Sequence, residues 1–137
     1  MFEQCLYFNT TSLARKLERE WAMAFKPFGL TPSQAFMLRV ILEKPQSYQN
    51  ALAKEMNITK PTASRGLDGL EKLGLIERRP SPDDAREIEV HPTRKANAMK
   101  DDLNAASGVV TKKFKKLLGI DEFLDVVGKL RGISEIL

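Results

Sequence analysis

The chain has 137 residues, of which 42% are hydrophobic, and its 22 basic and 18 acidic residues give a formal net charge of +4. This length fits one domain, and the lack of any run of about 18 apolar residues predicts that no segment crosses a membrane. A single cysteine excludes an intrachain disulfide framework. Because we also find no secretory signal, we expect a cytoplasmic protein. The positive charge favours a polyanionic partner without identifying one.

Two helices are predicted before residue 45. The first spans residues 5–28, where apolar residues recur at steps of three and four. Its apolar face carries Trp21, so we expect it to pack either beneath the core or on another chain. The second helix begins at Thr31, an N-cap whose capping box is completed by Gln34. This second helix is apolar almost all round, which predicts that it is buried.

Residues 49–74 form the centre of the prediction, because they read as two short helices joined by a tight turn. Asn57 tolerates the left-handed conformation that ends the first helix, and Thr59 caps the second. Leucines at 67, 70 and 73 anchor the end of the second helix, whereas residues 60–65 are small, polar or basic. A helix-turn-helix presents such an N-terminal end to the major groove. An ordinary pair of surface helices is the alternative for this stretch alone.

A β-hairpin is predicted directly after the second of these helices. Residues 75–79 are short and compatible with a strand, as are residues 87–91, where Ile88 and Val90 alternate with charged residues. The prolines and aspartates of residues 80–86 make a turn between them. A helix-turn-helix followed at once by a charged hairpin is typical of a winged helix. His91, the only histidine, has no cysteine cluster near it, so we expect neither a metal site nor a cofactor.

The C-terminal third is predicted to be helical. A helix over residues 94–118 would be roughly 37 Å long, and a last helix, capped by Asp121, would follow to residue 137. Both are amphipathic, as is the first helix of the chain. The predicted fold is therefore mainly α with a small β-hairpin wing. A winged helix-turn-helix domain would span residues 31–93, and residues 1–30 and 94–137 would form a helical region that dimerises with a second copy.

The order of elements and several motifs resemble the MarR (multiple antibiotic resistance regulator) family of bacterial regulators. The resemblance rests on Gly29-Leu30-Thr31-Pro32, on residues 67–78, and on Asp84-Ala85-Arg86 with Thr93 seven residues after Arg86. It implies a homodimeric transcriptional regulator, expected to be a repressor, that binds double-stranded DNA at a pseudo-palindromic operator. It also implies that a small-molecule or oxidative signal relieves the binding.

The predicted contacts to DNA come from the recognition helix, the helix before it and the wing. The candidates are Ser47, Gln49, Thr59, Lys60, Pro61, Thr62, Ser64, Arg65, Arg78 and Arg86. Arg65 would bind either a guanine or a phosphate, and we expect Arg86 to enter the minor groove. Asp68 and Asp84 are predicted to position the wing. The family resemblance implies that Asp68 pairs with Arg86.

The residues that sense a signal are less defined by the sequence. The family resemblance implies a small, often aromatic ligand. Candidate walls of its pocket are Trp21, Phe25, Phe36 and Met37, and simple core packing is the alternative for each. Cys5, followed by Leu6-Tyr7-Phe8, partly matches the reactive cysteine of the oxidation-sensing members. It has no basic neighbour in sequence to favour the thiolate, so a structural cysteine is the alternative.

Two other classes of function fit the sequence less well than DNA binding. A winged domain used only for protein contacts would present an apolar or acidic recognition helix, which Lys60, Arg65 and Arg86 argue against. An enzyme would need a catalytic constellation, and the sequence contains no phosphate loop, zinc motif or catalytic triad. We therefore predict that the protein is not an enzyme.

Overall fold

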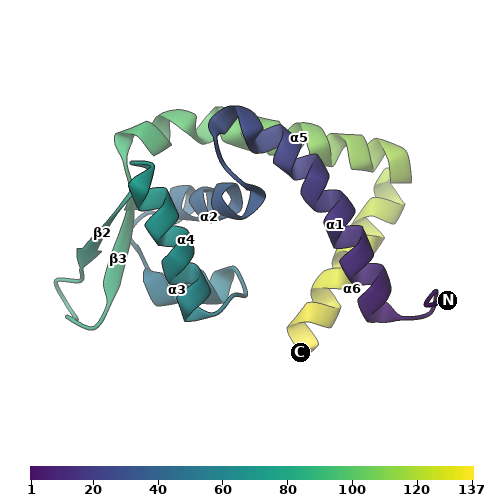
Figure 1. The fold of residues 1–137 in the computed structure, drawn as a ribbon, viewed down its shortest axis with the longest axis horizontal. Helices are drawn as coiled ribbons and strands as arrows, with labels where there is room; N and C mark the ends of the chain where they lie inside the picture. Colours follow the sequence, from purple (N-terminus) through teal and green to yellow (C-terminus); the bar gives the residue numbers. More distant parts are fainter.

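The computed structural model describes all 137 residues and consists of six α-helices, one 3₁₀ turn and three short strands (Figure 1). The helices are α1 (Leu6–Phe25), α2 (Pro32–Glu43), α3 (Gln49–Glu55), α4 (Lys60–Lys72), α5 (Arg94–Leu118) and α6 (Ile120–Ile136). The 3₁₀ turn η1 (Lys26–Phe28) follows α1, and the strands are β1 (Ser47–Tyr48), β2 (Ile76–Pro80) and β3 (Ile88–Pro92). The mainly helical fold with a β-hairpin wing is confirmed.

The predicted helix boundaries rest on local chemistry that the structure confirms. Thr31 forms the capping box with Gln34 at the start of α2, and Thr59 caps α4 by accepting the backbone N–H of Thr62 at 3.3 Å. Asn57 has φ +56°, the left-handed conformation expected where α3 gives way to α4. Thr93 caps α5 and also donates its hydroxyl to the carbonyl of Gly74 at 2.7 Å. That bond holds the end of α4 beside the start of α5.

The sheet has one strand more than predicted. Its order is β1-β3-β2 with both pairings antiparallel, and β1 joins β3 through the pairs Ser47 with Val90 and Tyr48 with Glu89. The strand β1 is only two residues long and lies immediately before α3, so no alternating pattern marks it in the sequence. The hairpin of β2 and β3 projects from the end of the molecule opposite to both termini (Figure 1).

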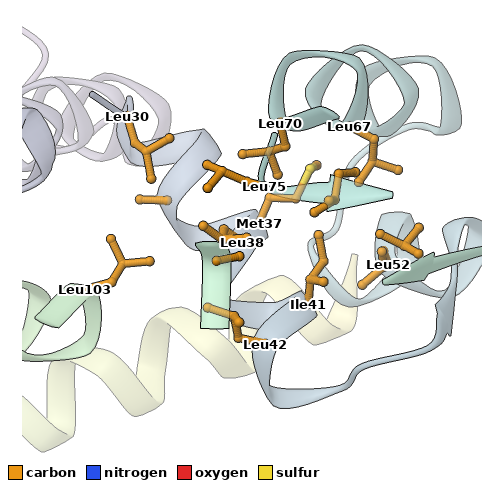
Figure 2. Close-up of a cluster of buried hydrophobic side chains, with 14 of the residues drawn as sticks. Leu30, Met37, Leu38, Ile41, Leu42, Leu52, Leu67, Leu70, Leu75 and Leu103 are labelled. Carbon is orange, nitrogen blue, oxygen red and sulfur yellow. The ribbon is translucent and has the colours of Figure 1, made fainter. Parts of the chain in front are cut away.

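One hydrophobic core of 15 residues holds the winged part together. Leucines from α2, α3, α4 and the start of β2 converge there, among them Leu38, Leu52, Leu67 and Leu70 (Figure 2). Leu103 of α5 belongs to the same cluster, as does Phe25 at the end of α1. The core thus includes residues from both regions into which the sequence was divided.

Three details of the sequence prediction need correction. Leu73 is 40% exposed and does not anchor α4, because it lies at the C-cap after the last buried leucine, Leu70. The N-cap of α6 is Gly119, so Asp121 lies within the first turn of that helix. The first helix ends at Phe25, and the chain then continues through the 3₁₀ turn that contains Pro27.

The helices at the two ends of the chain lie apart from the core. The second half of α5 extends away from the winged part, and α1 and α6 descend from it so that both termini lie at the same end (Figure 1). Helix α6 has no buried residue, and Phe25 is the only buried residue of α1. Apolar side chains along both are open to solvent, including Leu13, Leu124, Val127, Leu130 and Ile133.

None of the helices combines the length with the apolar character that a membrane-spanning segment requires.

Candidate nucleic-acid interface

The first three turns of helix α4 have one buried side and one exposed side. Ala63, Leu67 and Leu70 are fully buried, so one side of the helix is fixed on the core. The polar and basic side chains of the same turns point elsewhere. Thr59, Lys60, Pro61, Thr62 and Arg65 are exposed, and Ser64 is partly exposed. The structure therefore brings together the six candidates predicted from this stretch.

The exposed end of α4 points away from the rest of the molecule. Its C-terminal end is held against the start of α5 by the bond from Thr93 to Gly74, and α5 lies over the winged part like a beam (Figure 1). The N-terminal end consequently lies on the side away from α5, where α3 packs beside the helix and Lys60, Pro61 and Thr62 remain exposed. A helix held in this way can enter a groove of B-DNA with its first turns.

A short chain of hydroxyl contacts orients the basic residue of this surface. Arg65 donates from Nη2 to the hydroxyl of Thr62 at 3.2 Å, and the hydroxyls of Thr59 and Thr62 are 2.9 Å apart. The contact uses one of the five N–H donors of the guanidinium, so most of the fork remains available to an acceptor on DNA. Arg65 is thus held near the N-terminus of the helix without being neutralised by an acid.

The wing presents its arginine at the tip of the turn between β2 and β3. The Arg86 side chain is 91% exposed, and its Nε lies 3.3 Å from Oδ1 of Asp84. The same carboxylate oxygen accepts the backbone N–H of Arg86 at 3.0 Å. The buried hydroxyl of Ser81 accepts the backbone N–H groups of Asp83 and Asp84, which closes the turn from inside. Asp84 therefore orders the backbone that carries Arg86.

The predicted pairing of Asp68 with Arg86 is wrong, because Asp68 pairs with Arg78 instead. Arg78 lies on β2 directly after α4, and its Nη2 donates both to Asp68 and, at 3.0 Å, to Glu71. Its backbone N–H also donates to Glu71, at 3.3 Å. Arg86 lies at the far tip of the hairpin, whereas Arg78 lies beside the helix. Asp68 thus pairs with Arg78, which is the nearer of the two arginines.

The electrostatics of this bridge follow from its hydrogen bonds. The bond from Arg78 lowers the pKa of the Glu71 carboxyl, and the same bond is the main reason that the pKa of Arg78 is raised. The Arg78 side chain is only 20% exposed, which suits a brace between helix and wing better than a DNA contact. Sequence reasoning missed Glu71, although it lies three residues after Asp68, where the two side chains share one helix face.

Two predicted phosphate contacts at the start of α3 are partly engaged within the chain. Ser47 donates its hydroxyl to the carbonyl of Lys44 at 2.6 Å, so this hydroxyl closes the turn before β1. Gln49 is the first residue of α3, and its Oε1 is buried without a hydrogen-bond partner. Both residues are partly exposed, and neither lies on α4.

The four aromatic or apolar candidates for a ligand pocket divide into two pairs. Trp21 and Phe36 line an open cavity of about 490 Å³ between α1 and α2, together with Leu17, Met56 and Ile58. Phe25 is completely buried and Met37 is 3% exposed, so these two belong to the core. Phe25 contacts Phe36 edge to face at 5.8 Å between ring centroids. The core therefore supports one wall of the cavity.

Cys5 is exposed and serves as the N-cap of α1. Its Sγ accepts the backbone N–H of Phe8 at 3.5 Å, and the nearby rings of Phe2 and Phe8 lie 5.5 Å apart. Cys5 is therefore not buried within the single chain.

Comparison with known proteins identifies relatives across most of the chain. Residues 28–87 match the family model described as the MarR family. A putative transcriptional regulatory protein for the hcr operon of Thauera aromatica is 35% identical over 85 residues, which is 56% of this chain and 51% of that relative. The regulator MgrA of Staphylococcus aureus is 27% identical over 106 residues, covering 77% of this chain and 72% of that protein. The first of these matches thus spans about half of the relative's length.

Solved structures extend the likeness to the terminal helices. The S. aureus MepR–DNA complex superposes with a TM-score of 0.87 at 19% identity, over 96% of this chain and 98% of that one. The transcriptional repressor CouR bound to a 23-mer DNA duplex gives a TM-score of 0.84 at 26% identity, over 97% and 94%. The named relatives are regulators and not enzymes.

Proposed function

We propose that the chain is a homodimeric DNA-binding repressor of transcription of the MarR type in the bacterial cytoplasm, because its residues 28–87 match the MarR family model. The observation that carries the proposal is the surface of α4. Its first turns expose Lys60, Thr62 and Arg65, while Ala63 and Leu67 of the same turns are fully buried. The DNA present in the MepR and CouR structures supports the same reading.

Each part of the interface has a distinct role in this proposal. Arg65 and Thr62 contact base edges or phosphates in the major groove, and Lys60 contacts the backbone. Arg86 enters the adjacent minor groove, where a narrow A·T-rich segment attracts a guanidinium. Ser47 and Gln49 anchor a phosphate at the edge of the site. Arg78 braces the wing through Asp68 and Glu71, which reduces the ordering cost on binding.

The apolar faces of α1 and α6 support the homodimer. Leu13 on α1, and Leu124, Val127 and Leu130 on α6, are each at least 38% exposed, and apolar side chains that gather on an exposed face mark an interaction site. A second copy is the simplest partner, since a two-fold axis would pair like faces and place two α4 helices on one side. The operator is then pseudo-palindromic, with half-sites about 10 base pairs apart or a multiple of this distance.

The cavity between α1 and α2 supports relief by a small molecule more than relief by oxidation. Trp21 and Phe36 offer aromatic walls for a flat apolar ligand, and the volume of about 490 Å³ suits a small organic molecule. Cys5, in contrast, has no basic side chain among its hydrogen-bond partners. A thermal-shift screen of small aromatic acids, compared between the native chain and Phe36→Ala, tests this part of the proposal.

A gel shift with the upstream region of the protein's own gene tests the central part. We expect a specific shift whose affinity falls steeply with salt, since several phosphates are neutralised on binding. Unlabelled duplex of the same fragment should compete, and unrelated duplex should not. A protein that binds no fragment above the level of unrelated DNA at low salt would reject DNA recognition and favour a winged domain used for protein contacts.

A further inference from the structure

A polar cluster joins three helices at the junction between the winged part and the terminal helices. We call it the Ser107 node, and its members are Trp21 on α1, Arg39 on α2, and Asn104 and Ser107 on α5. Ser107 is one of two buried polar residues of the chain and is 4% exposed. A hydroxyl in this position on a long helix is unusual, because the neighbouring buried residues of α5 are apolar.

The hydroxyl of Ser107 accepts a hydrogen bond from each of the other two helices. Trp21 donates from Nε1 at 3.2 Å, and Arg39 donates from Nη1 at 2.9 Å. A hydroxyl oxygen has two lone pairs, so these donors fill its capacity as an acceptor. Helices α1 and α2 are therefore both hydrogen-bonded to a single atom of α5, the hydroxyl oxygen of Ser107.

Arg39 is held from a second side by Asn104, whose Oδ1 accepts from Nε at 2.7 Å. The guanidinium also lies 5.0 Å from the ring centroid of Phe36. Its hydrogen-bond partners are neutral, and the nearby Glu43 pairs instead with Lys100 at 3.5 Å. Burial accordingly lowers the pKa of Arg39, with partial opposition from the charge of Glu43. The planar fork can satisfy Asn104 and Ser107 together, which an ammonium group on a lysine cannot reproduce.

Directional bonds restrict motions that apolar packing permits. The contacts among Leu38, Phe25 and Leu103 resist separation of the helices, but apolar contact is not directional and tolerates small rotations. Two hydrogen bonds to one oxygen, together with a third to Asn104, fix the rotation of α2 and α1 about α5. Helix α2 belongs to the winged part that carries α4, and α1 carries an apolar face of the terminal helices. The node thus sits where an angle between the two regions is set.

We propose that the Ser107 node is a positioning device that sets the angle between the winged part and the terminal helices, and so the spacing between half-sites that a dimer accepts. Arg39 and Ser107 are positioning residues in this scheme, because they lie away from α4 and reach DNA only through the angle. The inference rests on the proposed function, since it requires a dimer that binds two half-sites. It adds a determinant of spacing that the recognition surface does not contain.

The test measures affinity against a series of duplexes that carry the site bound in the upstream fragment, with the centre lengthened or shortened by one or two base pairs. Each added base pair turns one half-site by about a tenth of a helical turn. For the native chain we expect the affinity to fall by about tenfold or more away from the best spacing. For Ser107→Ala we expect the same change of spacing to cost about threefold or less, or the best spacing to move.

Two further variants separate positioning from folding and from charge. Arg39→Lys keeps the positive charge but loses the fork, so it should behave like Ser107→Ala, and it decides the matter if Ser107→Ala does not fold. Glu20→Gln is the matched control, because it breaks the other polar contact between α1 and α5, the surface pair with Lys113 at 3.0 Å. Its spacing preference should remain that of the native chain.

The outcomes distinguish this inference from the function on which it rests. If the native protein binds no duplex, both the proposed DNA recognition and the positioning role of the Ser107 node are wrong. Native protein that binds with a clear spacing preference, retained unchanged by Ser107→Ala and Arg39→Lys, overturns the node and leaves DNA recognition intact. Native protein that binds all spacings equally also overturns it, because there is then no fixed angle to explain.

Discussion

The winged part and the terminal helices are built from equally regular helices, but they are buried to different extents: the winged part surrounds the core, whereas only the end of α1 and part of α5 reach it. Every buried residue of the chain lies between Phe25 and Val110. Helix α6 has none, although Val127, Leu130 and Ile133 recur along it with helical spacing. The winged part is therefore stabilised within the chain, whereas the terminal helices present an apolar face that only another molecule can cover.

Helix α5 belongs to both regions, and its burial changes along its length. Ala96 and Leu103 belong to the core shared with the winged part, Val110 is buried next to α1, and no residue beyond Val110 is buried. The first half of the helix is thus anchored on the winged part, whereas its second half packs against α1, where the rings of Trp21 and Phe114 stack with 5.8 Å between their centroids. We therefore expect DNA recognition and assembly to be separable, because α4 is fixed on the core whereas the proposed dimer face of α6 is exposed.

The largest effect is expected from removing α6. Deletion of residues 120–137 should give a monomer whose winged part stays folded, and its affinity for the operator should fall by on the order of a hundredfold or more, since linked half-sites gain that much in avidity. Sedimentation and fluorescence anisotropy measure the two quantities. A truncated chain that still sediments as a dimer would break the comparison between the two regions.

A pair of leucines, one from each region, sharpens the comparison. Leu67→Ala removes a fully buried side chain of the core and should lower the free energy of unfolding by about 2–5 kcal/mol. Its dimer dissociation constant should not change. Leu130→Ala on α6 should instead weaken the dimer by about tenfold, from the lost burial of apolar area. Denaturant melts give the free energy of unfolding, and sedimentation equilibrium gives the dimer dissociation constant. A weaker dimer for Leu67→Ala together with a less stable fold for Leu130→Ala would contradict the assignment of the core to the winged part.

Two exposed arginines, one in each region, test which region contacts DNA. Arg65→Ala on α4 should cost about 1–3 kcal/mol of binding free energy and relax the sequence preference. Arg19→Ala removes the same charge from α1 and should have little effect. Titration against the specific duplex and single-base variants measures both. Equal losses for the two variants would mean that only overall charge matters.

The wing is expected to contribute less than α4 and in a different way. Arg86→Ala should weaken binding by about 1 kcal/mol at sites with A·T-rich flanks and less at G·C-rich flanks, because a narrow minor groove attracts the guanidinium. Two duplexes that share half-sites and differ only in the flanks provide the measurement. Equal losses on both would contradict a role in the minor groove.

The smallest effect on folding is expected at the helix–wing bridge. Asp68→Ala removes a half-exposed partner of Arg78 and should change the free energy of unfolding by at most about 1 kcal/mol. It should nevertheless lower DNA affinity, because the wing loses part of its brace. Simple Coulomb attraction predicts tighter binding once the negative charge is removed. DNA titration of the native chain and of Asp68→Ala at one salt concentration separates the two explanations. Weaker binding by the variant supports the brace, and tighter binding supports simple Coulomb attraction.

The bridge also has a defined dependence on pH. Because Arg78 holds the pKa of Glu71 below its ordinary value, the carboxylate contributes stability that is complete above that ordinary value. The contribution is lost as the pH falls through the lowered pKa. Glu71→Gln should remove this part of the acid dependence, so a melt series from neutral to acid pH should show a smaller decline in the variant.

Much of the fold could be predicted because its signals are local. The caps at Thr31, Thr59 and Thr93 and the left-handed Asn57 lie within a few residues of what they control. The exposed face of α4 follows from the spacing of its apolar residues. These features require no knowledge of distant neighbours.

The missing parts depend on residues that are distant in sequence. Strand β1 exists only through β3, some forty residues later, and Asp68 was expected to pair with Arg86, whereas the fold brings Arg78 to it. An apolar periodicity also cannot separate a cavity wall from the core, so Phe25 and Phe36 looked alike. The Ser107 node joins helices up to 86 residues apart, beyond any local pattern.

The association state of the intact chain tests the central claim most directly. We predict that the free protein sediments at micromolar concentration with twice the mass of one 15.5 kDa chain, and that two chains bind one duplex carrying two half-sites. A free monomer that binds this duplex as one chain per site-pair, with α1 and α6 still exposed, would contradict the claim that a second copy covers the terminal helices.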